Sequence, residues 1–393
     1  ICRNVSDGSM EHFGAKAVIL ATGGNGQAWL PTTNALICTG DGMSMAYRAG
    51  AKLMDMEMVQ YHPTTLAGKG FLITEGARGE GAHLLNAEGE RFMERYAPNK
   101  MELASRDVVS RAEQTEINEG RGFPDGTVAL DITVVPRKRI HEALREIVLV
   151  GRDFAGVDIT REPIHIKPGN HYAMGGIKTD TEGRTNVPGL YAAGEVACVS
   201  VHGGNRLGAN SLLDTLIFGR RSGVDAAERA KGREPAAASR AALRDEESRI
   251  GAIMGREKGS GRRVSEIRRE LGETMDAKVA VFRDAEGLNE ALETVKRLKE
   301  EAESCYIDDK GSIFNQDILG AIELGYMLDC AECTCVGAIH RTESRGAQFR
   351  TDFPERNDEE WLKHIDLSRT DDGPEISYSD VTITQWEPQE RTY

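Results

Sequence analysis

The hydrophobic pattern of the chain changes near residue 226. Before this point, continuous apolar runs such as KAVILATGG at 16–24 and LYAAGEVAC at 190–198 end at glycines, which is typical of buried parallel strands. After it, apolar residues recur every three or four positions, the spacing of amphipathic helices. The pattern predicts sheet structure first and a helical region second.

The two strand-to-glycine junctions favour a doubly wound α/β sheet that binds a ligand at the carboxyl ends of its strands. Ordinary strand ends with glycine turns are the alternative at either junction. Residues 58–170 between them are mixed and glycine-rich, with a helix-like stretch from Ser105 to Glu119. We interpret this region as an insertion that interrupts the sheet.

Two apolar stripes predict packed helices within 226–345. Their members are Ile267, Leu271, Met275, Val279 and Phe282, and then Leu288, Leu292, Val295, Leu298 and Ala302. We expect a helical bundle without chemistry here. An irregular polar region at 346–393 follows, with a short closing strand at 381–384.

Composition narrows the possible partners. The chain has 393 residues and a net charge of -14, which would repel a nucleic-acid backbone. No run approaches the ~18 apolar residues of a membrane span, so we expect membrane association only through another subunit. The seven irregularly spaced cysteines suit a reducing, intracellular compartment.

The chain begins at Ile1 and reaches its first predicted strand after a short charged stretch. We interpret it as the later part of a longer protein. Five G-x-G sequences, at 24, 40, 68, 79 and 120, all lack the third glycine of the dinucleotide fingerprint. If the protein binds a dinucleotide, its pyrophosphate turn is expected upstream of residue 1.

The stretch TEGARGEG at 74–81 sets Glu75, Arg78 and Glu80 among three glycines. Glycine lets a ligand or another backbone approach closely, so charges in this setting indicate a site. A plain charged turn is the alternative.

Seven segments taken together resemble one family. They are QYHPTTL at 60–66, TEGARGEG, ERFMERYAP at 90–98, SRDVVSRA at 105–112, HYAMGGI at 171–177, GEVACVSVHGGNRLGANSLLD at 194–214 and TQWEPQERTY at 384–393. Over essentially its whole length the chain resembles the flavoprotein subunit of succinate dehydrogenase and fumarate reductase.

The resemblance implies an α/β plus α fold with an FAD-binding doubly wound sheet domain that is incomplete at its N-terminus. An α+β capping domain would be inserted into it, and a helical domain would follow. The expected ranges are 1–57 and 171–225 for the FAD-binding domain, 58–170 for the capping domain, 226–345 for the helical bundle and 346–393 for the irregular region. No residue of this chain matches the histidine that many members link covalently to FAD.

Succinate and fumarate differ by a hydride and a proton across a bond flanked by two carboxylates. Their site needs cationic or donor groups at both ends, a flavin on one face and a proton donor on the other. By resemblance, His62 and Thr74 hold one carboxylate, and His171 and Arg206 hold the other.

Arg106 matches the residue that resembles a general acid in this family. An arginine has a pKa above ~12, so its position against the substrate, with reprotonation by neighbours, would have to make it a donor. Glu75 and Arg78 match the family's relay to Arg106. The alternative is a purely structural salt bridge among these three residues.

Seven further residues match the family's flavin contacts. They are Thr22, Gly23, Gly24, Asp41, Glu195, Ser211 and Leu212. The Glu195 carboxylate would accept hydrogen bonds from ribose or ribityl hydroxyls. Ser211 and Leu212 would lie at a helix N-terminus beside the ring, where negative charge is stabilised.

No metal site is expected at Cys330, Cys333 and Cys335, because on a helix the third side chain points away from the other two. The resemblance places iron–sulfur clusters in a partner subunit and implies membrane anchor subunits. The chain would then be cytoplasmic, peripheral on the inner face of the cell membrane. Hydride transfer to or from FAD N5 would interconvert succinate and fumarate, and electrons would pass to the iron–sulfur subunit.

Three other functions are weighed against this one. L-aspartate oxidase shares HPT, RGEG and the NSLL region, but adjacent Thr74 and Glu75 and the WEPQERTY ending favour the dicarboxylate enzymes. The segment could also be an inactive fragment, since half of the cofactor site is absent. A nicotinamide dehydrogenase is disfavoured by the missing fingerprint and by the paired His and Arg residues.

Overall fold

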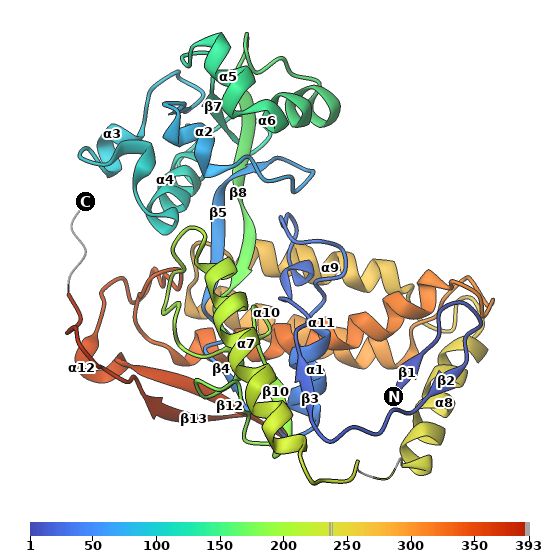
Figure 1. Ribbon diagram of the computed structural model, residues 1–393. Helices are drawn as coiled ribbons and strands as arrows, with labels where there is room; N and C mark the ends of the chain where they lie inside the picture. Colours follow the sequence, from blue (N-terminus) through green and yellow to red (C-terminus); the bar gives the residue numbers. More distant parts are fainter. Residues whose placement is uncertain (236, 238, 390–393) are drawn as a thin grey trace.

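The structure, a computed structural model, describes residues 1–235, 237 and 239–389. Figure 1 shows an upper lobe and a larger lower part, joined by two long strands. These strands are β5 (Val59–Leu66) and β8 (Ile164–Ala173), which pair antiparallel. Strand β5 contains the QYHPTTL motif, and β8 contains His171 of the HYAMGGI motif.

The expected parallel strands are β3 (Val18–Leu20) and β10 (Leu190–Ala192), and their parallel pairing is confirmed. The predicted burial of β3 is wrong: Val18 is 46% exposed and Ile19 41% exposed. In the described residues β3 and β10 form a two-stranded sheet, so the other edge and one face of β3 are left uncovered.

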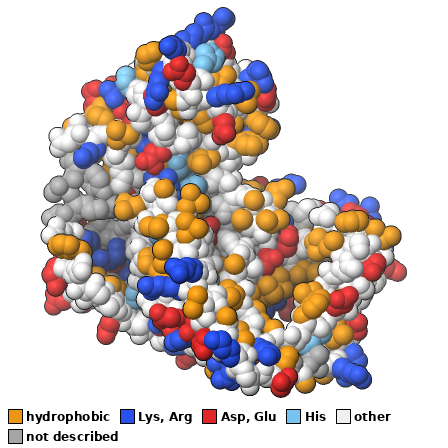
Figure 2. Space-filling model, viewed as in Figure 1, with side chains coloured by type: hydrophobic (Ala, Val, Ile, Leu, Met, Phe, Trp, Pro, Cys, Tyr) orange, Lys and Arg blue, Asp and Glu red, His pale blue; other side chains and the backbone are white. Residues whose placement is uncertain are grey.

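The long helix α7 (Asn210–Ala230) lies against β3 and β10 in front of the lower part. Its outer face is apolar over much of its length, and Figure 2 shows hydrophobic side chains gathered on that side of the molecule. The exposed apolar residues of α7 are Leu212, Leu213, Leu216, Ile217 and Val224.

The upper lobe is built on the four-stranded antiparallel sheet β5-β8-β7-β6, whose last two strands are β7 (Val128–Asp131) and β6 (His83–Leu85). The helix predicted from Ser105 to Glu119 is confirmed as α4 (Arg106–Asn118), which packs on β5. The other helices of the lobe are α2 (Glu75–Gly79), α3 (Met93–Tyr96), η2 (Met101–Leu103), α5 (Arg137–Ala143), α6 (Arg145–Val150) and η3 (Gly151–Ala155).

The lower part contains a second, five-stranded sheet of order β11-β9-β4-β12-β13. Its strands are β11 (Ala197–Cys198), β9 (Gly176–Lys178), β4 (Leu53–Met54), β12 (Lys363–Thr370) and β13 (Gly373–Asp380). Short elements of the N-terminal half are β1 (Cys2–Arg3), β2 (Met10–Glu11), η1 (Gly26–Ala28) and α1 (Asp41–Arg48).

The expectation of an irregular region at 346–393 is therefore wrong for its middle part, where β12 and β13 form a hairpin. The closing strand expected at 381–384 is absent from the structure at those residues. Ile365 and Leu367 of β12 are buried against the rest of the fold. The sequence signal for this hairpin is the Asp-Gly pair at 372–373, a common hairpin-turn sequence. Gly373 there has a φ of 112°.

The helical bundle is confirmed as α9 (Val264–Lys278), α10 (Ala285–Ser304) and α11 (Gln316–His340), which pack on one another. Helix α8 (Arg240–Gly255) lies beside them and α12 (Asp358–Trp361) precedes β12. Val279 and Phe282 of the first stripe lie just past the end of α9 yet still join this core. None of the helices in the described part of the chain is both long enough and apolar enough to cross a bilayer.

A buried ionic network ties the end of α11 to the N-terminal half. The Arg341 guanidinium donates to Glu57 at 2.6 Å, to Glu343 at 3.3 Å and to Asp55 at 3.5 Å. Because removing one partner would leave a buried charge unpaired, this network fixes how the C-terminal segments sit on the turn between β4 and β5.

We expect Leu298→Ala to lower the free energy of unfolding by about 2–5 kcal/mol, because Leu298 is fully buried in the bundle core. Chemical denaturation measures this loss. Leu292→Ala, on the same helix but at a partly buried position, is the matched control and should cost clearly less. Equal losses would contradict the packing described for α10.

Candidate active site

Two arginines from distant parts of the chain share one acceptor. Gln60 Oε1, on β5, accepts from Arg106 Nη1 at 2.9 Å and from Arg206 Nη2 at 3.1 Å. The Gln60 amide nitrogen donates to the Arg206 carbonyl at 2.7 Å. The buried amide of Gln60 therefore holds both guanidinium groups side by side.

Gln60 is a site residue that the sequence motifs did not indicate. The available signal was the strand period of two, because Gln60 and His62 lie two residues apart on one strand and thus face the same way. A glutamine carries no charge, so its role was visible only once both arginines were in place.

Arg206 lies in the loop before α7 and is buried. Its guanidinium stands over the Tyr172 ring, 4.3 Å from the centroid, while its Nε has no hydrogen-bond partner among the described residues. Burial, and secondly the charge of Arg106, lower the pKa of Arg206. The site thus holds a desolvated cation with an unused donor.

His62 and His171 meet edge to face, with ring centroids 5.0 Å apart. His62 Nδ1 accepts from the Thr64 backbone at 3.2 Å, and His171 Nδ1 lies 2.7 Å from the Thr33 hydroxyl. Burial lowers the pKa of both rings, that of His171 to about 3. The charges of Arg106 and Arg206 act on both rings in the same direction, so the two histidines are neutral at physiological pH.

The predicted relay residues lie next to one another. Glu75 Oε2 accepts from Arg106 Nε at 3.1 Å and lies 3.9 Å from Arg78 Nη2. The Glu75 side chain is 46% exposed, whereas that of Arg78 is fully buried and donates to the Glu102 carbonyl at 2.5 Å. This geometry allows a path from solvent through Glu75 to Arg106, and it equally satisfies the salt-bridge alternative.

Thr74 is placed at the edge of this group. It is the N-cap of α2, where its hydroxyl accepts from the Gly76 backbone at 3.3 Å. The cap explains why a threonine stands before Glu75. Of the four predicted substrate residues, the structure brings His62, His171 and Arg206 together with Arg106, and it leaves Thr74 exposed beside them.

On the cofactor side, glycines permit close approaches between the predicted residues. A Cβ on Gly24 would lie 2.3 Å from Glu195 Oε1, and one on Gly42 would lie 2.2 Å from the Thr22 hydroxyl. Gly23 has a φ of 76°, a backbone region that favours glycine. Asp41 begins α1 beside these residues.

A cavity of about 330 Å³ joins the cofactor side to the substrate side. Its lining residues are Thr33, Asn34, Cys38, His171, Tyr172, Glu195, Arg206, Ser211, Leu212 and Thr215. Burial raises the pKa of Glu195 to about 7, even though the carboxylate accepts from the Ala173 backbone. Predicted substrate and flavin residues therefore share one hollow.

The residues present fit a bound flavin. The cavity wall supplies an acceptor in Glu195 and the first turn of the 21-residue helix α7, which begins at Asn210. The buried Asn34 Oδ1 and Arg206 Nε have no partner among the described residues and are able to bond to a polar ring.

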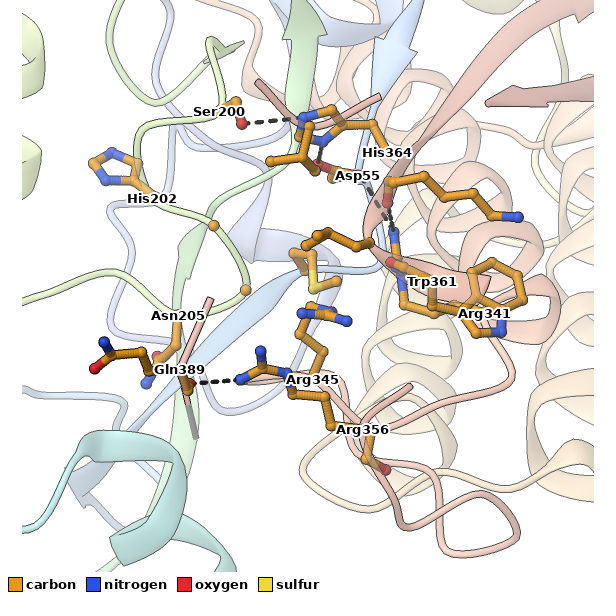
Figure 3. Close-up of a pocket in the computed structure, with 18 residues that line it drawn as sticks. Asp55, Ser200, His202, Asn205, Arg341, Arg345, Arg356, Trp361, His364 and Gln389 are labelled. Carbon is orange, nitrogen blue, oxygen red and sulfur yellow. Dashed lines mark hydrogen bonds and ion pairs between the residues drawn. The ribbon is translucent and has the colours of Figure 1, made fainter. Parts of the chain in front are cut away.

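A second cavity, of about 510 Å³, is lined in part by the loop at 200–205 (Figure 3). In it, His364 stands between Ser200, 3.1 Å from Nε2, and Asp55, 2.5 Å from Nδ1. Burial opposes a charge on His364, but Asp55 outweighs it and raises the pKa. The hydrogen bond to Asp55 ties His364, and with it β12, to the turn that follows β4, so we assign this arrangement to packing of β12.

Cys330, Cys333 and Cys335 all lie buried on α11. Burial raises the pKa of each thiol, which keeps them protonated. Within the described residues, no three His, Cys, Asp or Glu side chains are grouped so as to hold a metal ion.

Comparison with known proteins defines the class. Residues 1–212 match the family described as FAD binding domain, and residues 268–393 match the family described as Fumarate reductase flavoprotein C-term. The fold and the site are thus those of an FAD-binding flavoprotein.

Similarity to individual proteins defines the family within this class. The chain is 46% identical to the succinate dehydrogenase flavoprotein subunit of Rickettsia bellii, over 97% of this chain and 66% of that protein. It is 43% identical to the fumarate reductase flavoprotein subunit of Mycobacterium tuberculosis, over 99% and 70%. The chain belongs to the family of succinate dehydrogenase and fumarate reductase flavoprotein subunits, and it spans about two thirds of the length of these relatives.

Solved structures of fumarate reductases have the same fold as this chain. A mutant of E. coli quinol fumarate reductase superposes with a TM-score of 0.89 at 39% identity, over 95% of this chain and 67% of that one. A quinol-fumarate reductase with menaquinol molecules gives a TM-score of 0.92 at 39% identity, over 98% and 70%.

We expect His171→Asn to reduce the acid sensitivity of the fold. The unfolded chain binds a proton at His171 near pH 6.5 and the folded chain only near pH 3, so stability falls as the pH drops through this window. Between pH 7 and pH 5 the loss from this residue amounts to about 2 kcal/mol. Urea unfolding at both pH values measures it.

His165→Asn, at a side chain that is 43% exposed, controls for the loss of an imidazole. If H171N loses as much stability on acidification as the unsubstituted protein, the neutral buried state of His171 is disproved.

Proposed function

We propose that this chain interconverts succinate and fumarate as part of a flavoprotein subunit that binds FAD. The observation that carries this proposal is the shared Gln60 oxygen, which aligns two desolvated guanidinium groups within reach of two neutral histidines. A dianionic four-carbon acid supplies the negative charge that this cluster lacks.

The roles follow from chemistry. Arg206, with its unused Nε and planar fork, is proposed to hold one carboxylate together with His171. His62, and Thr74 at the tip of α2, are proposed to bind the other. Neutral histidines serve better here as hydrogen-bond donors than as charges, because their protonation beside two arginines is costly.

Arg106 is proposed as the proton donor to the substrate carbon. Gln60 and Glu75 fix its guanidinium from two sides, which is the preorganisation that a general acid needs. Glu75 is exposed enough to exchange protons with solvent, so Glu75 and Arg78 are proposed to return the proton to Arg106.

FAD would be held by Thr22, Gly23, Gly24, Asp41, Glu195, Ser211 and Leu212. Of these, Glu195, Ser211 and Leu212 line the cavity, and Gly24 lies against Glu195. When bound, it supplies hydride acceptance or donation. The chain's own residues bind the diacid, exclude water from it and move its proton.

We further propose the expected division into domains, with 58–170 as a capping domain over the FAD-binding residues and 226–345 as the helical domain. An iron–sulfur subunit would receive the electrons, and membrane anchor subunits would hold the assembly at the inner face of the membrane. The relatives are themselves named as flavoprotein subunits, which supports such partners.

Anaerobic mixing of the complete holoprotein with substrates tests the proposal. We expect succinate to bleach the oxidised flavin and fumarate to restore it. Bleaching by L-aspartate instead would identify an aspartate oxidase, and bleaching by NADH a nicotinamide enzyme. A protein that neither retains nor takes up FAD would support the inactive-fragment alternative.

We expect Arg106→Lys to lower kcat about 10²–10⁴-fold with little change in KM, since a lysine cannot reach Gln60 and Glu75 in the same fork geometry. Steady-state kinetics with succinate measures both constants, and the flavin spectrum verifies cofactor content. Arg111→Lys, on the same helix but paired with Asp107, is the control. A large rise in KM with unchanged kcat would make Arg106 a binding residue only.

A further inference from the structure

Glu113 is a carboxyl group in the core of the upper lobe. It lies on α4 seven residues after Arg106, so the two side chains share one face of the helix about two turns apart. Glu113 is 0% exposed, and neither of its oxygens has a hydrogen-bond partner among the described residues. No role proposed above uses it.

Arg78 on α2 is the charged group that acts on Glu113. The guanidinium of Arg78 is itself fully buried, and its Nε and Nη2 lack hydrogen-bond partners in the described part of the chain. Arg78 also acts on Glu75, at 3.9 Å. It therefore couples the buried acid electrostatically to the proposed relay.

Two other buried glutamates of the lobe, Glu102 and Glu116, are paired with arginines. The Glu102 carboxylate accepts two hydrogen bonds from Arg91. Glu116, three residues along α4, pairs with Arg95 and Arg121 and also accepts from Tyr96 and Asn86. Glu113 has no such partners.

A carboxylate with no hydrogen bond in an apolar core is strongly disfavoured relative to its neutral acid. Burial accordingly raises the pKa of Glu113 well above its ordinary value, against the pull of Arg78. Burial also works against ionisation of Glu116, but the hydrogen bonds from Arg121, Tyr96 and Asn86 lower its pKa to about 2. The pKa values of these two glutamates, one turn apart on α4, are thus shifted in opposite directions.

We propose that Glu113 is a positioning residue for the relay: it carries a proton in the resting protein and, through Arg78, controls the return of the proton to Arg106. This inference rests on the proposed function for its kinetic consequence, while the protonation of Glu113 does not. With Glu113 neutral, Arg78 faces Glu75 on the relay side. Loss of the Glu113 proton would place a competing negative charge beside Arg78, hold its proton more tightly and draw it away from Glu75.

Infrared spectroscopy of the complete holoprotein tests the protonation. The difference between wild type and Glu113→Gln should contain the C=O stretch of a protonated carboxyl group. The difference between wild type and Glu116→Gln, the matched control on the same helix, should lack it. No carboxyl band in the first difference would show that Glu113 is ionised and would overturn the proposal. This result does not depend on any dicarboxylate reaction, so it stands even if the proposed function fails.

The pH profile of kcat tests the coupling. Wild type should lose activity on the alkaline side as Glu113 ionises, and in E113Q, which is always neutral, we expect that loss to be at least about threefold smaller. Coincident profiles would overturn the coupling, because a merely structural glutamate would change activity equally at all pH values. Glu113→Leu is the second variant should the amide not fit: it too is neutral and should show the same flattened profile.

Discussion

The site depends on one constraint: positive charges are gathered in a desolvated place with too few negative ones beside them. Arg106 and Arg206 share the neutral oxygen of Gln60 in place of a carboxylate, and Glu75 is the carboxylate that meets Arg106 directly. Two guanidinium groups held in this way repel one another. Burial first, and then the charges of these arginines, lower the pKa of the histidines beside them. An anionic ligand would remove this cost, which is why we propose a dicarboxylate as the substrate.

The fold brings these charged groups together from both parts of the molecule. Strands β5 and β8 run from the upper lobe into the lower part (Figure 1) and carry Gln60, His62 and His171. Helix α4 brings Arg106 from the upper lobe, and the loop before α7 brings Arg206 from the lower part. The site therefore lies where the two parts meet, and the Gln60 amide is one of the groups that join them by hydrogen bonds. The buried network around Arg341 holds the C-terminal segments against the base of β5.

Buried carboxyl groups in this molecule differ in charge because their surroundings differ. Glu116 is ionised, since arginines, a tyrosine and an amide donate to it, whereas Glu113 has no donors and is neutral. Glu195 lies between these cases, with one backbone donor and a pKa of about 7. Burial raises the pKa of each acid, and the hydrogen-bond donors around it decide how far that shift is offset.

Much of the fold was readable from the sequence, because local periodicity is set by which face of an element is buried. The helix stripes of 264–304, helix α4 and the parallel pairing of β3 with β10 all follow from such patterns. The hairpin of β12 and β13 was missed and β3 was expected to be buried, since partners distant in sequence decide both. For the site, motifs identified the arginines and histidines but not Gln60 or Glu113. A neutral amide that bridges two cations, and an acid without donors, acquire their roles only from neighbours that the tertiary structure brings within a few ångströms.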